Sequence, residues 1–205
     1  YTADPRFGYP YSKMLAEKIV LAANGPSFRT TALRPHLIWG PGDPHFLPRL
    51  TAKARSGRLR LLKSAALVDG TYIDNAARAL FLAAEKMMAG EAETIGGRAY
   101  FIAQGEPLTA ADLIQNILEA VSPPGKTLKI KGLLPLWLGR WAGAAIEDLW
   151  RLAKLKKEPP LNRFVVEELS LPHWFDLSRA RRDLGYQPHI SMAEGLQKLR
   201  QSISI

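Results

Sequence analysis

Helical and extended patterns alternate along this chain, and that alternation constrains the fold more than any other feature. Residues 12–24 place apolar side chains at positions 15, 19 and 22 and end at Asn24-Gly-Pro, a stop signal for a helix. Residues 29–35 are rich in β-branched side chains and predict a strand. Residues 99–103 (AYFIA) predict a buried strand. Helices that alternate with short strands are typical of an α/β protein.

The same patterns divide the rest of the chain. Asp74 is the expected N-cap of a helix at 75–88, and Thr109 is expected to cap the helix that follows it. The remaining elements are predicted helices at 46–56, 109–121, 133–155, 178–184 and 191–201, and predicted extended segments at 68–73 and 127–130. With 205 residues, 47% of them hydrophobic, the chain can bury a sizeable core and fits one domain or one and a half.

Composition excludes several classes of protein. The absence of cysteine excludes disulfide scaffolds, thiolate zinc sites and cysteine nucleophiles. No apolar stretch is long enough to cross a membrane, and no leader precedes the first helix, so we expect a cytoplasmic protein. The net charge of +9 favours an anionic partner.

That charge is concentrated in one segment. Residues 126–157 hold eight Lys or Arg and two acidic residues, and three of the five tryptophans. One helical face of this segment is apolar and carries Leu134, Trp137, Leu138, Trp141, Ala145, Leu149 and Leu152. A basic, Trp-bearing amphipathic helix at 133–157 fits a lipid better than nucleic acid. We expect its apolar face to line or gate a lipid pocket and its ends to touch an anionic membrane surface; the alternative is a helix that packs in the core.

The main chemical signal is Tyr9 and Lys13, four residues apart at the start of a helix. This spacing places both side chains on one face. A nearby ammonium favours the tyrosinate, which makes the phenol a better acid–base group at neutral pH. The lysine can also donate to ribose hydroxyls. The alternative is a chance match, because this spacing is common on amphipathic helices.

Other chemistries find little support. Histidines 36, 45, 173 and 189 are scattered without ligand spacing, so no metal is predicted. There is no Gly-x-Ser-x-Gly elbow for a serine hydrolase. No zinc-finger or RNP-type signature supports nucleic-acid binding.

The order of the motifs carries a family resemblance. The Tyr-x-x-x-Lys helix is followed by Leu33-Arg-Pro35, Gly40-Pro-Gly-Asp43, Tyr72-Ile-Asp-Asn75 and the segment 176–188. This series resembles the extended short-chain dehydrogenase/reductases. The segments Glu158–Phe164 and His173–Asp176 make it most similar to the 3β-hydroxysteroid dehydrogenase/isomerase branch, including 2-alkyl-3-oxoalkanoate reductases and sterol-4-carboxylate 3-dehydrogenases.

The resemblance implies NAD or NADP as cofactor, a hydrophobic substrate and a homodimer. Tyr9 and Lys13 would be catalytic and would contact the cofactor, with Lys13 on the nicotinamide ribose. The nicotinamide end would meet Pro35, His36 and Ile38, although His36 is equally well explained as a wedged structural side chain. The substrate would meet Asp43 and Tyr72. Packing and capping are an alternative explanation of the Tyr72–Asn75 motif.

The resemblance also implies a missing part. Relatives carry a Gly-rich dinucleotide fingerprint and a catalytic Ser or Thr before the tyrosine, and neither is found here; Gly40-Pro-Gly42 is a turn. We therefore expect the C-terminal portion of a Rossmann-type NAD(P)-binding fold plus a small α/β substrate-binding domain, with the N-terminal dinucleotide-binding half absent. Residues 1–45 would be the Rossmann remnant and 46–205 mainly the substrate-binding domain, with 72–90 returning to the Rossmann part.

The predicted function is that of a fragment of an oxidoreductase. The intact enzyme would interconvert a secondary alcohol and a ketone on a sterol, 3β-hydroxysteroid or 3-oxoalkanoate, and the fragment alone would be inactive. One alternative is a nucleotide-sugar epimerase or dehydratase that uses the same Tyr–Lys pair. The other is a non-catalytic, membrane- or lipid-binding fragment.

Overall fold

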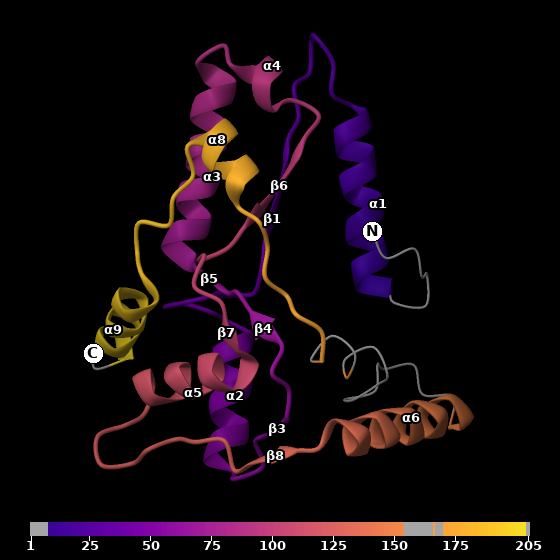
Figure 1. Cartoon of the computed structure of the whole chain (residues 1–205), viewed down its shortest axis with the longest axis vertical. Helices are drawn as coiled ribbons and strands as arrows, with labels where there is room; N and C mark the ends of the chain where they lie inside the picture. The colour runs from indigo at the N-terminus through magenta and orange to yellow at the C-terminus, as the bar shows by residue number, and fades with distance from the viewer. Residues whose placement is uncertain (1–7, 154–165, 167–169, 204–205) are drawn as a thin grey trace. The chain divides into compact units, whose positions relative to one another are not determined.

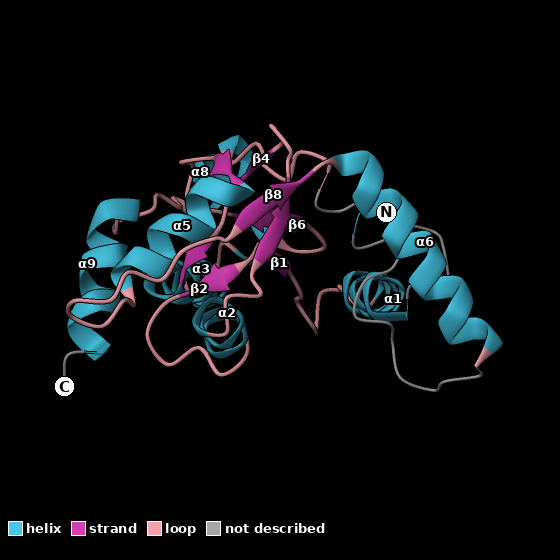
Figure 2. Cartoon of the chain, turned by 90° about the horizontal axis from the view of Figure 1, so that it is seen from below, coloured by secondary structure: helices cyan, strands magenta, loops and turns pink. Residues whose placement is uncertain are grey.

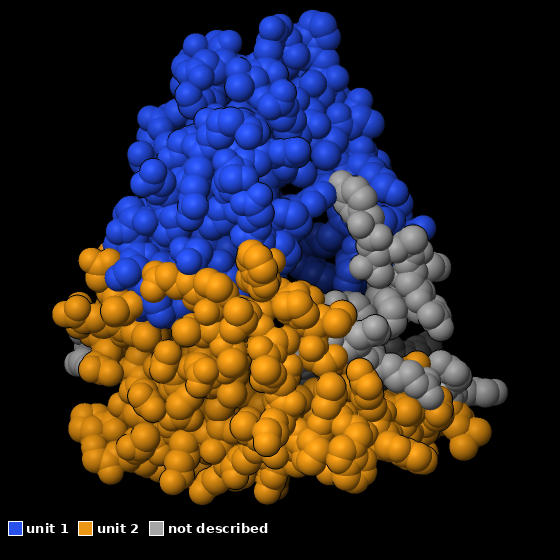
Figure 3. All heavy atoms as spheres, in the orientation of Figure 1, with its two compact units in different colours: residues 1–38, 69–105, 175–192 blue, residues 39–68, 106–174, 193–205 orange. Residues whose placement is uncertain are grey.

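The computed structural model describes residues 8–153, 166 and 170–203. The chain forms two compact units, each assembled from three separate segments. Unit 1 comprises residues 1–38, 69–105 and 175–192, and unit 2 comprises residues 39–68, 106–174 and 193–205 (Figure 3). Each unit therefore depends on contacts between segments that are distant in the sequence.

Unit 1 is built around a pair of parallel strands. Its elements are α1 (Gly8–Ala22), β1 (Ala32–Pro35), β5 (Thr71–Tyr72), α3 (Ile73–Met88), α4 (Ala92–Ile95), β6 (Ala99–Ile102) and α8 (Ser178–Leu184). Strand β1 pairs in parallel with β6, in a register that sets Ala32 opposite Ala99 and Pro35 opposite Ile102. Helix α1 lies on one side of this pair, and α3 and α8 lie on the other (Figure 1).

The core of unit 1 lies between the strand pair and helices α3 and α8. Small residues at helical spacing, Ala76, Ala79 and Ala83, form the buried face of α3 and allow close approach. Tyr100 and Ile102 alternate along β6 with less buried neighbours, as the two-residue period of a strand requires. The core cluster consists of Ala79, Ala83, Ile95, Tyr100, Ile102, Ala103, Leu177, Ala180, Leu184 and Tyr186.

Unit 2 contains two further strand pairs and, among its described residues, three complete helices and most of a fourth. Its elements are α2 (Phe46–Arg55), β3 (Arg60–Leu62), β4 (Leu67–Val68), β7 (Leu108–Thr109), α5 (Ala110–Ala120), β8 (Gly132–Leu134) and α6 (Leu136–Leu152). Strands β3 and β8 pair in parallel, and β4 and β7 pair antiparallel. Strand β2 (Ile38–Trp39) and helix α9 (Met192–Ile203), both labelled in Figure 2, begin in unit 1 and continue into unit 2.

Several predicted elements are confirmed, and the α/β class with them. Helix α5 begins directly after Thr109, whose hydroxyl accepts from the Asp112 amide at 3.1 Å, so the predicted cap is correct. The helices predicted at 46–56 and 178–184 are α2 and α8. Helix α8 ends at Gly185 with φ of 67°, a left-handed conformation that glycine adopts without strain.

Three predictions at the level of elements are wrong. Asp74 is not the N-cap of α3: the helix begins at Ile73, Tyr72 is the cap residue, and Asp74 lies in the first turn. The strand predicted at 127–130 lies instead at Gly132–Leu134, because the backbone there pairs with Arg60–Leu62. The helix predicted from 133 consequently starts only at Leu136.

The two units divide the chain differently from the predicted domains. Residues 72–90 lie in unit 1 together with the Tyr9 helix, and so do residues 91–105 and 175–192, which the sequence assigns mainly to the substrate-binding domain. The family segment Glu158–Phe164 and the lysines at 154, 156 and 157 lie outside the described residues. Within the described residues, none of the helices has the length and apolar character needed to cross a membrane.

Candidate functional site

Tyr9 and Lys13 lie together on the first turns of α1. The Lys13 Nζ atom lies 5.5 Å from the centroid of the Tyr9 ring, within the range of a cation–π contact. Tyr9 is 70% exposed, so its phenol is open to a ligand. Ser12 donates to the Tyr9 carbonyl at 2.8 Å within the same turn. The structure thus brings the two predicted catalytic residues together at an accessible helix end.

Helix α1 is held in place one turn beyond Lys13. Glu17 accepts two hydrogen bonds from Arg34 of β1, from Nε at 2.6 Å and from Nη2 at 2.5 Å. The Glu17 side chain is only 12% exposed, which makes this bidentate ion pair stronger than a surface pair. The Arg34 guanidinium also lies 5.0 Å from the centroid of the Phe101 ring. The Glu17–Arg34 ion pair fixes the position of helix α1, which carries Tyr9, on the strand pair.

His36 directly follows β1 and is half-buried. Its Nδ1 atom lies 2.9 Å from the carbonyl oxygen of Asp69. A carbonyl oxygen only accepts, so the proton of this hydrogen bond belongs to Nδ1, which fixes the tautomer of the neutral ring. The ring meets Phe175 edge-on at 5.2 Å, and Phe175 stacks on Phe101 at 4.3 Å. These contacts give His36 the wedged packing that the sequence left as an alternative to cofactor contact.

The chain turns sharply at Leu37, which has a positive φ of 40°. This left-handed conformation costs a residue with a Cβ of the order of 1–2 kcal/mol. Thr71, which is fully buried, holds it there: its amide donates to the Leu37 carbonyl at 3.1 Å. The Thr71 hydroxyl lies 2.8 Å from the His36 carbonyl and 3.0 Å from the Ile102 carbonyl. The surrounding backbone therefore imposes the turn that orients residues 35–38.

Pro35 and Ile38, on either side of this turn, line one cavity of about 250 Å³ in unit 1. All of its lining side chains are apolar: Leu33, Pro35, Ile38, Ile73, Ala76, Ala77, Leu80 and Ile102. Pro35 and Ile38 are both exposed. An uncharged, flat or aliphatic group fits this chemistry, whereas a charged group would be left without partners.

Tyr72 and Asn75 have internal contacts. Tyr72 is 1% exposed, and burial together with the charge of Asp74 raises the pKa of its phenol. The Asn75 Oδ1 atom accepts from the amides of His189 and Ile190, and Nδ2 donates to Gln104 Oε1 and to the Ile190 carbonyl. All four hydrogen-bonding positions of the Asn75 amide are filled. The motif is thus explained by packing, and a substrate contact of Tyr72 stays a prediction.

Asp43 lies in unit 2, whereas the other six predicted site residues lie in unit 1. Its carboxylate accepts from the amides of His45, Phe46 and Leu47 at 2.8–3.0 Å and so caps the start of α2. Burial acts to raise the pKa of Asp43, but these backbone hydrogen bonds outweigh it and the pKa is lowered. Asp43 also lines a cavity of about 420 Å³ with residues of α2 and α9. Its role in substrate binding stays a prediction.

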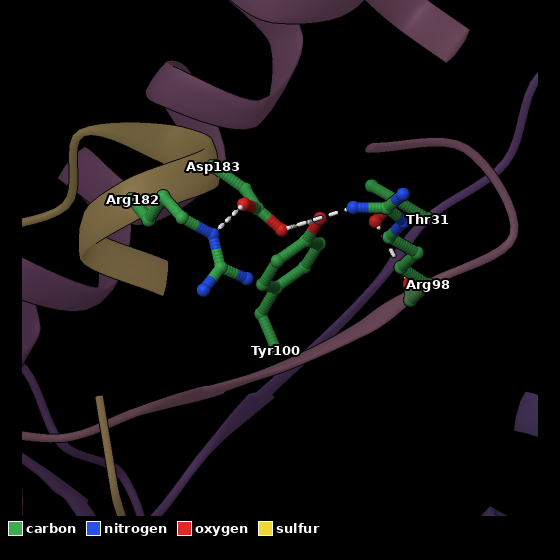
Figure 4. Close-up of polar contacts among 5 residues, drawn as sticks. All are labelled: Thr31, Arg98, Tyr100, Arg182 and Asp183. Atoms are coloured by element: carbon green, nitrogen blue, oxygen red, sulfur yellow. Dashed lines mark hydrogen bonds and ion pairs between the residues drawn. The ribbon is translucent and has the colours of Figure 1, made fainter. Parts of the chain in front are cut away.

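A second polar cluster was not anticipated from the sequence. The Asp183 carboxylate, buried on α8, accepts from Arg182 Nε at 2.8 Å, from the Tyr100 hydroxyl at 3.1 Å and from Arg98 Nη1 at 3.2 Å (Figure 4). Burial acts to raise the pKa of Asp183, but these partners lower it below its usual value. The Thr31 hydroxyl donates to the carbonyl of Arg98, the residue that directly precedes β6. The cluster ties α8 to β6, and its location indicates a structural role.

The part of the chain that the structure describes holds no cluster of three or more His, Asp or Glu side chains suited to a metal ion. Sequence reasoning missed the Glu17–Arg34 pair and the Asp183 cluster. A signal existed for Glu17, which lies four residues after Lys13 on the same helix. Nothing in the spacing identifies Arg34, Tyr100 or Asp183 as partners.

Comparison with known proteins identifies the class. A model of the 3-beta hydroxysteroid dehydrogenase/isomerase family matches residues 1–130, more than half of the chain. The chain therefore belongs to this family, as the motif order predicted. A 2-alkyl-3-oxoalkanoate reductase of Stenotrophomonas maltophilia is 47% identical over 98% of this chain and 60% of its own length. The human sterol-4-alpha-carboxylate 3-dehydrogenase (decarboxylating) is 30% identical over 98% of this chain and 54% of its own length.

Solved structures share the fold. RMD from Pseudomonas aeruginosa, complexed with NADPH, matches 96% of this chain and 56% of its own, with a TM-score of 0.57 and 16% identity. UDP-glucuronic acid 4-epimerase from Bacillus cereus, with UDP-glucuronic acid and NAD, matches 95% and 50%, with a TM-score of 0.58 and 20% identity. The predicted class of cofactor, NAD or NADP, is the one bound in these neighbours. The chain spans about half to three fifths of the length of these proteins.

Proposed function

We propose that this chain is part of an NAD(P)-dependent oxidoreductase that interconverts a ketone and a secondary alcohol on an apolar acid. The observation that carries the proposal is the exposed Tyr9 phenol with the Lys13 ammonium 5.5 Å from its ring on α1. Membership of the 3-beta hydroxysteroid dehydrogenase/isomerase family supports the same reaction class.

The residues of unit 1 fit the nicotinamide end of the cofactor. Lys13 offers an ammonium for ribose hydroxyls, and the apolar cavity between Pro35 and Ile38 offers a surface without charge. When bound, the nicotinamide supplies or accepts the hydride. The protein's own part is the proton: the Tyr9 hydroxyl donates it to the ketone oxygen in reduction and takes it back in oxidation.

The two relatives indicate the substrate class. A 2-alkyl-3-oxoalkanoate and a sterol 4-carboxylate oxidised at position 3 both place the reacting carbon β to a carboxylate, on an apolar skeleton. We propose a β-oxo or β-hydroxy acid of this kind for the present chain. Asp43 and Tyr72 remain candidates for substrate contact within this proposal.

The test uses the polypeptide of the natural reading frame that contains these 205 residues. Oxidation of a 2-alkyl-3-hydroxyalkanoate is followed by NADH or NADPH absorbance. Tyr9→Phe should lower kcat by about 10²–10⁴-fold, because the proton acceptor is lost. Tyr11→Phe, on the same helix, should retain activity. Turnover of UDP-sugars with no response to hydroxy acids would overturn the proposal in favour of an epimerase.

The 205-residue chain alone gives an independent test. Its sequence contains no G-x-x-G-x-x-G fingerprint for the cofactor pyrophosphate. We propose that this chain by itself neither binds NAD(P)H tightly nor turns over, and that the fingerprint belongs to a region outside these 205 residues. A fluorescence titration with NADH measures this directly, and tight binding by the 205-residue chain would refute it.

A further inference from the structure

We infer that the apolar face of helix α6 binds the surface of an acidic phospholipid bilayer. This inference goes beyond the oxidoreductase proposal and does not depend on it. The face, termed here the Trp face, consists of Trp137, Leu138, Trp141, Ala145, Leu149 and Leu152.

The Trp face is exposed. Trp137 is 64% exposed, Trp141 74% and Leu152 81%, and Leu138 and Leu149 are exposed as well. At 3.6 residues per turn these six side chains occupy about a third of the helix circumference. One acidic residue, Asp148, lies within this arc and is exposed. The sequence predicted the apolar face, and the structure places it toward solvent.

Helix α6 packs against β3 through a face other than the Trp face. Gly139 and Gly143 are buried, and the space around Gly139 is filled by the side chain of Leu62 on β3. The small residues let α6 approach β3 closely, so the large apolar side chains on the remaining circumference are not needed for packing on that strand. A contiguous exposed patch of this kind marks an interaction site.

Charge selects the partner. Lys126, Lys129, Lys131 and Arg140 are exposed before and along α6, and residues 126–157 carry a net +6. Acidic lipid headgroups attract such a segment, and tryptophan is the side chain that best suits a membrane interface. A second copy of the chain would bring two segments of the same positive sign together, which is unfavourable. Because none of the described helices is suited to cross a bilayer, the helix would lie in the interface plane.

The experiment is co-sedimentation of the 205-residue chain with vesicles of phosphatidylcholine, with and without phosphatidylglycerol. Binding should require the acidic lipid and weaken as salt is raised. Trp137→Ser with Trp141→Ser should abolish binding, whereas Trp174→Ser, at an exposed tryptophan outside α6, should not.

Two double variants with the same change in net charge test the contribution of the basic residues. Lys129→Gln with Lys131→Gln should lower the partition coefficient roughly thirtyfold, at about 1 kcal/mol per basic residue near an acidic surface. Lys53→Gln with Lys198→Gln makes the same change in net charge at exposed positions outside this segment and should have little effect. Equal losses in both double variants would overturn the assignment to α6.

Spectroscopy separates insertion from non-specific adsorption. Brominated acyl chains should quench the tryptophan fluorescence of the wild-type chain. Trp137→Phe with Trp141→Phe should keep binding but lose most of this quenching, because the apolar face remains while the two fluorophores are gone. Absence of vesicle binding, or a dimer in sedimentation velocity that dissociates in the Trp137→Ser/Trp141→Ser variant, would overturn the inference.

Discussion

Replacing Asn75 by alanine tests the buried amide that joins α3 to residues 188–190. The Asn75 side chain fills four hydrogen-bonding positions, and no exposed surface remains on the residue. In Asn75→Ala, the Ile190 carbonyl keeps its hydrogen bond from Gln104 Nε2, and Gln104 Oε1 keeps that from the Tyr72 amide at 3.2 Å. The amides of His189 and Ile190 lose their acceptor.

The magnitude follows from these two amides. A buried donor left without an acceptor costs about 1–3 kcal/mol. Two such donors, partly relieved by water at a half-buried segment, predict a loss of about 3 kcal/mol in the free energy of unfolding. A typical domain has only about 5–15 kcal/mol in total, so the effect is large.

Urea denaturation of the wild-type chain and the variant measures the loss. Hydrogen exchange should show faster exchange at the His189 and Ile190 amides than in the wild type. Asn116→Ala, a half-buried asparagine on α5, is the control and should change the free energy by less than about 0.5 kcal/mol. Equal unfolding curves for Asn75→Ala and Asn116→Ala would refute the reasoning.

Two further predictions concern the ion pairs of unit 1. The pKa of Asp183 is lowered in the folded state, so its contribution to stability should be complete above the ordinary carboxyl range and disappear as pH falls through the lowered value. The difference in urea midpoint between the wild type and Asp183→Asn should therefore be largest near pH 7 and shrink below about pH 4. A difference that stays constant with pH would contradict this prediction. Glu17→Gln should weaken the bidentate contact with Arg34 and cost about 1–2 kcal/mol, with faster amide exchange in α1, whereas Glu85→Gln on α3 should leave that exchange unchanged.

The helices could be predicted because their signals are local. Thr109 caps α5 through a residue three positions away, and the apolar spacing of residues 113, 117 and 118 is visible in the sequence. Strands were less predictable, because a strand of two or three residues is defined by its partner. The pairing of β8 with β3 joins residues 132–134 to residues 60–62, and no local pattern specifies that register.

The same distinction governs the candidate site. Tyr9 and Lys13 are four residues apart on one helix, so their proximity follows from helical geometry. The contacts that place them, and that shape the turn after β1, bridge long separations: Glu17 to Arg34 spans 17 positions, and Thr71 to His36 spans 35. Leu37 shows the limit most clearly, because a leucine carries no indication of a positive φ, and tertiary contacts such as the hydrogen bond from the buried Thr71 amide hold it there. Local sequence therefore predicts which side chains could do chemistry, whereas the orientation of the residues beside them depends on tertiary contacts.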